Sequence, residues 1–529
     1  MSRISFLISL LIFFAICAAY ILMMLSKTEN YYTYIIDDAY IHLAIAKNFA
    51  LHDVWGMTPY KFSSSSSSPI FTFILSVFIS VFGNNELYPL FFNILCGFLI
   101  IVFLNKYYAR FFSRRKSIIF ANLFTLFFAV LHLQILLGME HVLQVFIIVV
   151  NIFYFYQWSQ SEFKNKISAF WFYFTIAFLG LIRFESMFYF VSFAFVFLLI
   201  KKIKPAIFIL LFGFVPILIF GYFNYGQTGY FFPNSVIVKG TQFSFSGDYF
   251  RQLYRILFQN MFLNITFYKV GIFPLLMAII LIHRDYKNKK KIKEIVSENF
   301  LILVLGLTLI LQSMFGGFKG TFRYEAYILT GFSMAIIPKL KSFFASFSLM
   351  PKKEKMVGFI IVFTFLLMIY KFGFAHLMIT KSSANIYEQQ IQSAKFLKKY
   401  YNTSKVVAND IGAICYFSDI HLMDIAGLGS VEMIPFNLNK KKFDDDFENY
   451  LTQYCAKNKY ELAVVYEEWL GGHVPKNWKK VAILKINNKM NVAIDHVTIY
   501  SIDPKIHGEL KQNVKKFDWN KNVEVRIFE

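Results

Sequence analysis

The chain has 529 residues, of which 57% are hydrophobic, 20% are aromatic and only 16% are charged. Soluble domains carry about 25% charged residues, so this composition excludes an ordinary soluble protein and indicates a polytopic membrane protein. The formal net charge of +22 would suit a nucleic-acid-binding protein. Here the lysines and arginines form short clusters between apolar segments, as cytoplasmic loops of membrane proteins do, and we expect no nucleic-acid partner.

Apolar segments suited to transmembrane helices recur along most of the chain. The predicted spans, about eleven in number, are residues 4–25, 87–104, 117–131, 142–157, 168–181, 187–200, 205–222, 265–282, 299–314, 326–338 and 356–375. The segment from Pro69 to Phe82 is short for a span and is predicted to be a re-entrant or surface helix. The first span is longer than a signal-peptide core and is predicted to remain as an anchor.

These spans place Arg3 and every dense lysine and arginine cluster on one side of the membrane, which the positive-inside rule identifies as the cytoplasm. From about Lys381 the sequence becomes more polar. It predicts an amphipathic helix over residues 385–401 and short strands at residues 406–408, 413–417, 462–466, 481–486 and 497–502. The expected fold is an all-α polytopic membrane domain over residues 1–380, followed by a small extracytoplasmic α/β domain over residues 381–529.

The four cysteines divide between these regions. Cys17 and Cys96 lie in apolar spans and are predicted to be inert core thiols. Cys415 and Cys455 lie in the polar C-terminal region, where a disulfide is an alternative if that region is extracytoplasmic. No CxxC or Cys/His spacing is present, so no structural zinc site is predicted.

Two adjacent carboxylates, Asp37 and Asp38, follow the first span and a tyrosine-rich stretch. A carboxylate within reach of a sugar hydroxyl can accept its proton during attack, which contributes about 10²–10⁴-fold to a rate. The alternative is that one of them caps the following helix, because aspartate is a favoured N-cap residue. Paired carboxylates could also hold Mg²⁺ or Mn²⁺, but no third ligand is identifiable, so we assign no metal and keep a divalent cation as the one open cofactor.

Residues 38–50 are predicted to form an amphipathic helix along the outer surface. Its apolar face consists of Ala39, Leu43, Ala46 and Ala50, and the residues off that face are Asp38, His42 and Lys47. We interpret His42 as a histidine of the polar face, with a catalytic role as the alternative. The six serines from Ser63 to Ser68 are of low complexity and typical of a flexible loop.

Five isolated charges lie at the expected outer ends of spans: Glu140, Arg183, Glu185, Arg323 and Glu325. Charged side chains at membrane depth cost about 2.5–3.5 kcal/mol each and are functional candidates. Because arginine binds phosphate bidentately, Arg183 and Arg323 are predicted to bind a donor phosphate. The alternative is an ion pair between helices, for instance between Arg183 and Glu140 or Glu325.

The segment from Tyr230 to Lys239 supplies a further candidate. Lys239 could meet a phosphate as a point charge. The alternative is that the segment only begins a helix, with Asn234 or Ser235 as its cap.

Short motifs occur in a fixed order along the chain. They are Asp37-Asp38-Ala39-Tyr40-Ile41 with Ala46-Lys47-Asn48, Ser67-Ser68-Pro69-Ile70-Phe71, Gly138-Met139-Glu140, Leu181-Ile182-Arg183-Phe184-Glu185, Pro233-Asn234-Ser235 with Lys239, Arg323-Tyr324, Asp410-Ile411-Gly412-Ala413 and Asp424-Ile425-Ala426-Gly427-Leu428. Together they resemble the GT-C superfamily of polyprenyl-phosphate-sugar-dependent glycosyltransferases. The resemblance is to the bacterial branch that includes the mycobacterial terminal arabinofuranosyltransferases, although Phe184 stands where that branch has proline.

The resemblance implies a GT-C fold, a polyprenyl-phosphate-linked sugar donor, inversion at the anomeric carbon, and one aspartate of the pair as general base. It implies a multi-pass enzyme of the bacterial inner (plasma) membrane that transfers the sugar to a cell-envelope glycan or glycolipid on the outer face. Its implied site residues are Asp37 and Asp38 as catalytic residues, Arg183, Arg323 and Lys239 at the donor phosphate, and Glu140, Glu185, Asn234, His42 and Tyr324 in support.

The sugar is not fixed by the resemblance, and two other functions remain alternatives. A polysaccharide ligase or polymerase would have a large outer loop, whereas the loop expected at residues 223–264 is moderate. A non-enzymatic transporter of lipid-linked glycans would have ionisable groups near the middle of its spans, whereas the charges here gather at the outer ends. A glycosyltransferase is therefore the function we predict.

Overall fold

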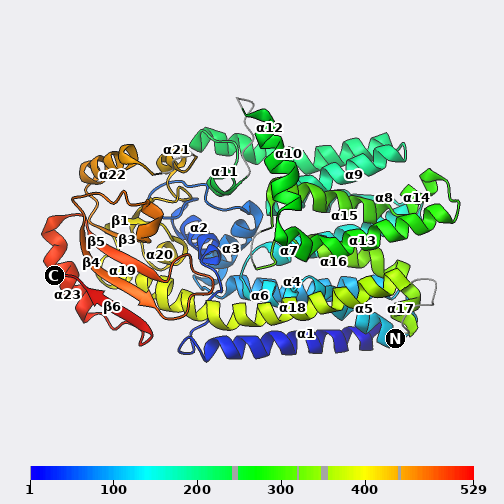
Figure 1. The fold of residues 1–529 in the computed structure, drawn as a ribbon, viewed down its shortest axis with the longest axis horizontal. Coiled ribbons are helices and arrows are strands. Elements are labelled where there is room, and N and C mark those ends of the chain that lie inside the picture. The colour runs from blue at the N-terminus through cyan, green and yellow to red at the C-terminus, as the bar shows by residue number, and fades with distance from the viewer. Residues whose placement is uncertain (1, 241–247, 319–320, 347–354, 439–442) are drawn as a thin grey trace. The chain divides into compact units, whose positions relative to one another are not determined.

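The computed structural model describes residues 2–240, 248–318, 321–346, 355–438 and 443–529 (Figure 1). The chain divides into two compact units, and neither is a single continuous stretch. The first, which we call the helical unit, contains Met1–Ala19, Leu90–Phe220 and Gly240–His376. The second, which we call the sheet unit, contains Tyr20–Pro89, Gly221–Lys239 and Leu377–Glu529.

The helical unit consists of helices joined by short connections, and four of its helices continue into the sheet unit. Its helices, whole or in part, are α1 (Ser2–Leu25), α4 (Tyr88–Tyr108), α5 (Arg115–Phe128), α6 (Leu131–Leu136), α7 (His141–Gln160), α8 (Lys166–Ile182), α9 (Met187–Leu199), α10 (Ile203–Thr228), α12 (Tyr249–Tyr254), α13 (Ile265–Lys287), α14 (Ile292–Glu298), α15 (Phe300–Leu311), α16 (Ala326–Ile336), α17 (Lys341–Ser346) and α18 (Lys355–Ile386). Two π-helical segments, Arg255–Phe262 and Gln312–Gly316, complete it.

Each predicted span coincides with a helix, and the short segment Pro69–Phe82 is a separate helix with those bounds. Among the described residues, six helices are long and apolar enough to cross a membrane, or up to seven if a pair of helices bent by 76° counts as one span. The protein is therefore a multi-pass membrane protein by composition, while the number of about eleven crossings stays a prediction. The sequence did not predict α6 and α14.

The interior of the helical unit is filled by aromatic rings. Helix α7 packs against α8 and α16, and α15 packs against α9 and α16. The rings of Phe155, Phe193 and Phe300 meet there, with centroids 4.9–5.6 Å apart. Only 28% of the apolar window of α10 is buried within the protein, which leaves the rest of that helix free to contact lipid.

The sheet unit contains the remaining helices and all six strands. Its helices are α2 (Asp38–His52), α3 (Pro69–Phe82), α11 (Asn234–Lys239), α19 (Gln392–Tyr400), α20 (Gly412–Phe417), α21 (Ile434–Leu438), α22 (Asp445–Asn458) and α23 (His507–Lys516). Its strands are β1 (Lys405–Ala408), β2 (His421–Asp424), β3 (Leu462–Val465), β4 (Lys479–Ile486), β5 (His496–Ser501) and β6 (Val523–Ile527).

The strands form one mixed sheet with the order β2-β1-β3-β5-β4-β6. Strand β1 is parallel to β2 and β3, whereas β5 is antiparallel to β3 and β4, and β4 is antiparallel to β6. Val407, Ala463 and Tyr500 belong to the hydrophobic core on one side of this sheet, together with Phe447 and Leu451 of α22. A small α/β region follows residue 381, as predicted.

One predicted strand is wrong. Residues 413–417 belong to helix α20, and Gly412 to Tyr416 are buried throughout. A short apolar run that is buried on every side has no period of two or of 3.6, so its sequence does not distinguish a strand from a helix. The other four predicted strands are present, while β2 and β6 were not predicted.

Each unit contains two of the four cysteines. All four cysteines are buried and unpaired, so Cys415 and Cys455 form no disulfide with each other. Cys455 instead packs against Met423, with its Sγ 4.0 Å from the Met423 Sδ. Residues 241–247 of the loop expected at 223–264, and residues 319–320 before Arg323, lie outside the described residues.

Candidate functional site

Asp37 is held by the first turn of a helix far away in the sequence. The Gly412 N–H donates a hydrogen bond to Asp37 Oδ2 at 2.6 Å, and the Ala413 N–H donates one to Oδ1 at 2.8 Å. Its side chain makes no hydrogen bond to the start of its own helix α2. Asp37 stands at the N-cap position of α2, but the alternative of a capping side chain does not hold for it, because its carboxylate accepts hydrogen bonds from the free amides of α20 instead.

A second carboxyl group meets Asp37 at this point. Asp410 lies beside Asp37 and accepts hydrogen bonds from Gln390 Nε2 at 2.6 Å and from the Tyr466 hydroxyl at 3.0 Å. Burial, followed by the proximity of Asp410, raises the pKa of Asp37 well above its usual range, and burial likewise raises the pKa of Asp410.

Helix α2 contacts α20 at its other end as well. The Lys47 ammonium donates to the carbonyl of Tyr416 at 3.0 Å and pairs with Asp419 at 2.9 Å. An acid at the N-terminus of a helix and a cation at its C-terminus both stabilise the helix dipole. Asp37 and Lys47 therefore fix α2 to α20 from the two ends of α20.

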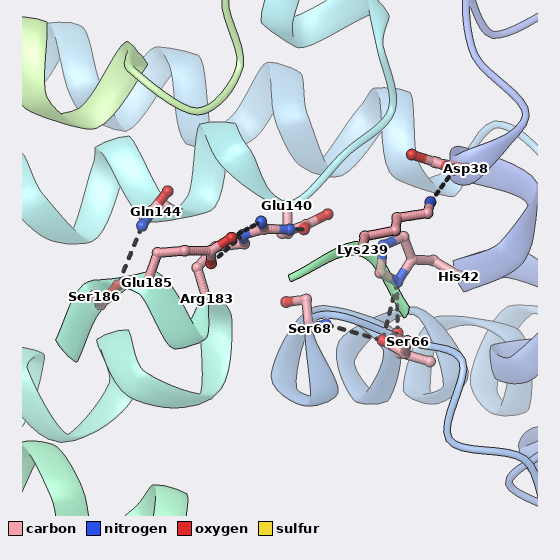
Figure 2. Close-up of polar contacts among 11 residues, drawn as sticks. Asp38, His42, Ser66, Ser68, Glu140, Gln144, Arg183, Glu185, Ser186 and Lys239 are labelled. Carbon is pink, nitrogen blue, oxygen red and sulfur yellow. Dashed lines mark hydrogen bonds and ion pairs between the residues drawn. The ribbon is translucent and has the colours of Figure 1, made fainter. Parts of the chain in front are cut away.

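Asp38 has a different environment from its neighbour. It is the first residue of α2, and its side chain keeps 28% of its surface exposed. Lys239, at the end of α11, places its ammonium 3.6 Å from Asp38 Oδ1 and is itself 42% exposed (Figure 2). The structure thus separates the acid pair into one buried carboxyl engaged by backbone amides and one accessible carboxylate beside a cation.

The motif from Asp424 to Leu428 positions the segment that carries Lys239. Asp424 accepts backbone hydrogen bonds from Leu428 at 2.6 Å and Gly429 at 2.7 Å, which folds the loop after β2. The carbonyl of Leu428 then accepts hydrogen bonds from Asn234 Nδ2 at 3.0 Å and from Ser65 Oγ at 2.7 Å. Asn234 begins α11, so this loop positions the helix that ends at Lys239. Burial raises the pKa of Asp424 to about 6.

The serine run is not a flexible loop. Of its six residues only Ser67 is not buried, and the backbone carbonyl of Ser64 accepts a hydrogen bond from the Asn234 N–H at 2.9 Å. His42 Nδ1 lies 2.8 Å from Thr72 Oγ1 and 3.2 Å from Ser66 Oγ. Composition misled here because the hydroxyls of Ser63, Ser65 and Ser66 are hydrogen-bonded, which offsets the cost of burying them. The hydroxyls of Ser64 and Ser68 are buried without a partner among the described residues.

The surface position predicted for the helix at residues 38–50 also needs correction. Ala39 to Asn48 of α2 are all buried, since α2 packs between α3 and α20. His42 and Lys47, which were expected off the apolar face, are only 2% and 6% exposed. His42 therefore joins α2, α3 and the serine run, and its contacts are those of a positioning residue.

In the helical unit, Arg183 is occupied by two carboxylates. Its Nη1 donates to Glu140 Oε1 at 2.6 Å, and its Nε donates to Glu185 Oε2 at 3.1 Å, while Nη2 pairs with Glu185 Oε1 (Figure 2). Glu140 is fully buried and Arg183 is 5% exposed. Arg183 with Glu140 is the inter-helix ion pair given as the alternative to phosphate binding. A second contact joins the same parts of the chain, since Gln144 Nε2 of α7 donates to Ser186 Oγ, next to Glu185, at 3.1 Å.

Tyr324 lies between two guanidinium groups. Its ring centroid is 5.0 Å from the Arg183 Cζ and 5.1 Å from the Arg323 Cζ, which are distances of cation–π contacts. The next residue, Glu325, is buried and interacts electrostatically with Lys371 of α18. Lys371 was not among the residues predicted from the sequence, although a lone lysine within an apolar span marks a functional candidate. Arg183 is thus paired with Glu140 and Glu185, and Lys371 interacts with Glu325.

One set of side chains among the described residues has the geometry of a metal site, and it does not include the acid pair. Asp445, Glu448 and His473 of the sheet unit have ligand atoms within 4.8 Å of one another. The Asp445 side chain is 93% exposed, and exposed acidic groups of this kind are common without an ion. A divalent cation at Asp37 and Asp38 stays a prediction.

The fold and part of the sheet unit resemble known proteins. The family model described as Domain of unknown function (DUF8728) matches residues 384–500. The structure resembles ArnT from Cupriavidus metallidurans bound to undecaprenyl phosphate, with a TM-score of 0.52, 11% identity, and coverage of 93% of this chain and 98% of that chain. It resembles the apo form of the same protein with a TM-score of 0.50 at 12% identity, with the same coverage. No curated protein sequence matches the chain.

A third solved structure, the apo oligosaccharyltransferase of Archaeoglobus fulgidus, has a TM-score of 0.45 at 12% identity and covers 94% of this chain and 78% of that chain. The two ArnT matches span nearly the whole of both chains. They confirm the predicted GT-C fold, in which apolar helices precede a small C-terminal region with a sheet. At these identities the likeness concerns the fold, and the arabinofuranosyltransferase branch stays a prediction.

Proposed function

We propose that the protein is a membrane glycosyltransferase that uses a polyprenyl-phosphate-linked sugar as donor. The observation that carries this proposal is the division of labour within the acid pair, in which Asp37 is buried against α20 and Asp38 stays accessible beside Lys239. The ArnT fold supports it, since one of the matching ArnT structures has undecaprenyl phosphate bound. The proposed acceptor is a cell-envelope glycan or glycolipid on the outer face of the membrane.

Asp38 is the proposed general base. Its carboxylate takes the proton of an acceptor hydroxyl as the hydroxyl oxygen attacks the anomeric carbon of the donor. The bond between that carbon and the phosphate oxygen breaks on the opposite face, which inverts the configuration and releases polyprenyl phosphate. Asp37 has a different role, because its two carboxylate oxygens already accept hydrogen bonds from backbone amides. It positions the base.

Lys239 is the proposed first contact of the donor phosphate. Its ammonium is partly exposed and lies at the edge of ion-pair distance from Asp38, so it is accessible to a phosphate. Arg183 is a weaker candidate than its sequence motif implies, because Glu140 and Glu185 already neutralise it. A contribution of Arg323 to donor binding stays a prediction.

The test is an assay of purified protein with a panel of polyprenyl-phosphate sugars and candidate glycan acceptors. Release of free polyprenyl phosphate that depends on the acceptor supports the proposal. We expect Lys239→Met to raise the KM for the donor about tenfold or more, as loss of a charged hydrogen bond does, with a smaller change in kcat. If no donor of the panel is turned over, or if Asp38→Asn leaves turnover unchanged, the proposal is wrong.

A further inference from the structure

The helical unit contains a second candidate binding site, formed by residues that the proposed reaction does not use. A cavity of about 450 Å³ lies where α7 ends, beside the bend between α14 and α15 and the segment after α16. The bend is 76°, and Ser297 to Ile302, which surround it, line the cavity. We call it the basal cavity and define it by Tyr156, Gln160, Phe163, Asn299 and Lys339.

The charged residues that line the basal cavity are Lys339 and Glu298. Lys339 is half-buried, and among the described residues its ammonium makes no hydrogen bond and no ion pair. The two nearby acids are already engaged, since Lys290 pairs with Asp285 at 2.9 Å and with Glu298 at 2.6 Å. Burial lowers the pKa of Lys339 below its usual range, so an anion in the cavity would stabilise its charged form.

The walls of the cavity offer both polar and apolar contacts. Asn299 donates through Nδ2 to Asp285 at 2.8 Å, while its Oδ1 is buried without a hydrogen-bond partner among the described residues. Two further cations contact aromatic wall residues without lining the cavity, with the Arg110 Cζ 5.8 Å from the Tyr156 ring centroid and the Lys202 Nζ 4.7 Å from the Phe163 ring centroid. The cavity thus combines one lining lysine, an unused acceptor and aromatic walls.

We propose that the basal cavity binds the head group of an anionic phospholipid. The phosphate would pair with Lys339, a head-group hydroxyl would donate to Asn299 Oδ1, and the first acyl carbons would lie along the aromatic walls. A lipid fits better than a small soluble anion because so much of the lining is aromatic. The lysine and arginine clusters at these helix ends are typical of the cytoplasmic membrane surface, where anionic lipids are abundant.

The experiment uses the full-length protein in mixed micelles that contain phosphatidylglycerol or phosphatidylcholine with the same acyl chains. Native mass spectrometry counts the lipid that stays bound. We expect the wild-type protein to retain phosphatidylglycerol about tenfold more tightly, because a charged hydrogen bond contributes at least that factor. Equal retention of the two lipids would overturn the proposal.

Variants then locate the site. Lys339→Met should abolish the preference, while Lys341→Met, which removes an exposed lysine of the same cluster, should keep it. Gln160→Glu adds a negative charge at an exposed position of the cavity lining without changing side-chain size, and should weaken phosphatidylglycerol binding. This variant tests the site even if Lys339→Met proves unstable. An unchanged preference in both Lys339→Met and Gln160→Glu, or equally strong competition by free glycerol phosphate, would contradict a lipid site here.

Discussion

Two charged clusters of this protein, Asp38 with Lys239 and Arg183 with Glu140 and Glu185, differ in how deeply they are buried. Asp38 and Lys239 are partly exposed and 3.6 Å apart, so their attraction is weak and a substrate can replace it. Arg183 is buried and hydrogen-bonded to two carboxylates. Both clusters come from sequence motifs that suggested binding, yet the geometry suits the first for chemistry and the second for holding helices.

The difference teaches that a charge at membrane depth is not by itself a binding site. Charged side chains there are costly and are functional candidates, but a buried arginine with two acidic partners gains little from a further anion. The local sum at Arg183 is one positive and two negative charges. A phosphate is therefore unfavourable at Arg183 unless one of the glutamates becomes protonated or moves away.

Breaking the Arg183 cluster should have the largest effect on stability. Arg183→Met leaves Glu140 buried and unpaired, and removal of one partner of a buried ion pair costs about 3–5 kcal/mol. We expect a large fall in the melting temperature of the purified protein. Arg251→Met, at an arginine whose side chain is 86% exposed, serves as the control and should melt as the wild type does.

A different outcome would revise the comparison. If Arg183→Met melts at the wild-type temperature but binds the donor less tightly, the arginine contacts substrate and the ion pair is dispensable. Glu140→Gln combined with Arg183→Met should recover part of the lost stability under our account, because the buried charge without a partner is then gone.

A substitution at Gly412 tests the contact between Asp37 and α20. A Cβ at this position would lie 2.3 Å from the Asp37 carbonyl oxygen and 2.6 Å from Asp37 Oδ2, so Gly412→Ala must push α20 away from the acid pair. Overpacking of this kind costs about 1–3 kcal/mol. We expect lower stability and a loss of turnover that follows the displaced Asp38. Gly508→Ala is the matched control, because a Cβ there meets nothing within 4 Å, and wild-type turnover by Gly412→Ala would refute the tight contact.

The burial of Asp37 and Asp410 gives a smaller, pH-dependent effect on stability. Burial raises the pKa of both carboxyl groups in the native state, so the unfolded chain loses these protons first, near pH 4. The native state then binds more protons than the unfolded state. The stabilisation is fully present below about pH 4 and is lost as pH rises through the raised native pKa.

Asp410→Asn removes one titrating group. We expect the melting temperature of this variant to decline less than that of the wild type as pH is raised from about 4 into the alkaline range. Asp518→Asn, at an exposed aspartate, should follow the wild-type curve. Parallel curves for Asp410→Asn and wild type would argue against a raised pKa of Asp410 in the native state.

The sequence predicted the parts of the structure that depend on local signals. Long apolar runs located the helices, and the change in composition near Lys381 located the mixed sheet. The acid pair was also predicted as a site, but the different environments of Asp37 and Asp38 were not. The amides that bind Asp37 lie 375 and 376 residues away along the chain. The serine run shows the same limit, since its burial depends on contacts with Asn234 and Leu428.

Paired turnover measurements on Asp37→Asn and Asp38→Asn test the account most directly. The assay is release of free polyprenyl phosphate at saturating donor, with the melting temperature of each protein measured in parallel. The account predicts that Asp38→Asn melts as the wild type but loses about 10²–10⁴-fold in turnover, whereas Asp37→Asn melts at a lower temperature. Wild-type turnover by Asp38→Asn, or a stable Asp37→Asn protein that is as inactive as a catalytic mutant, would contradict it.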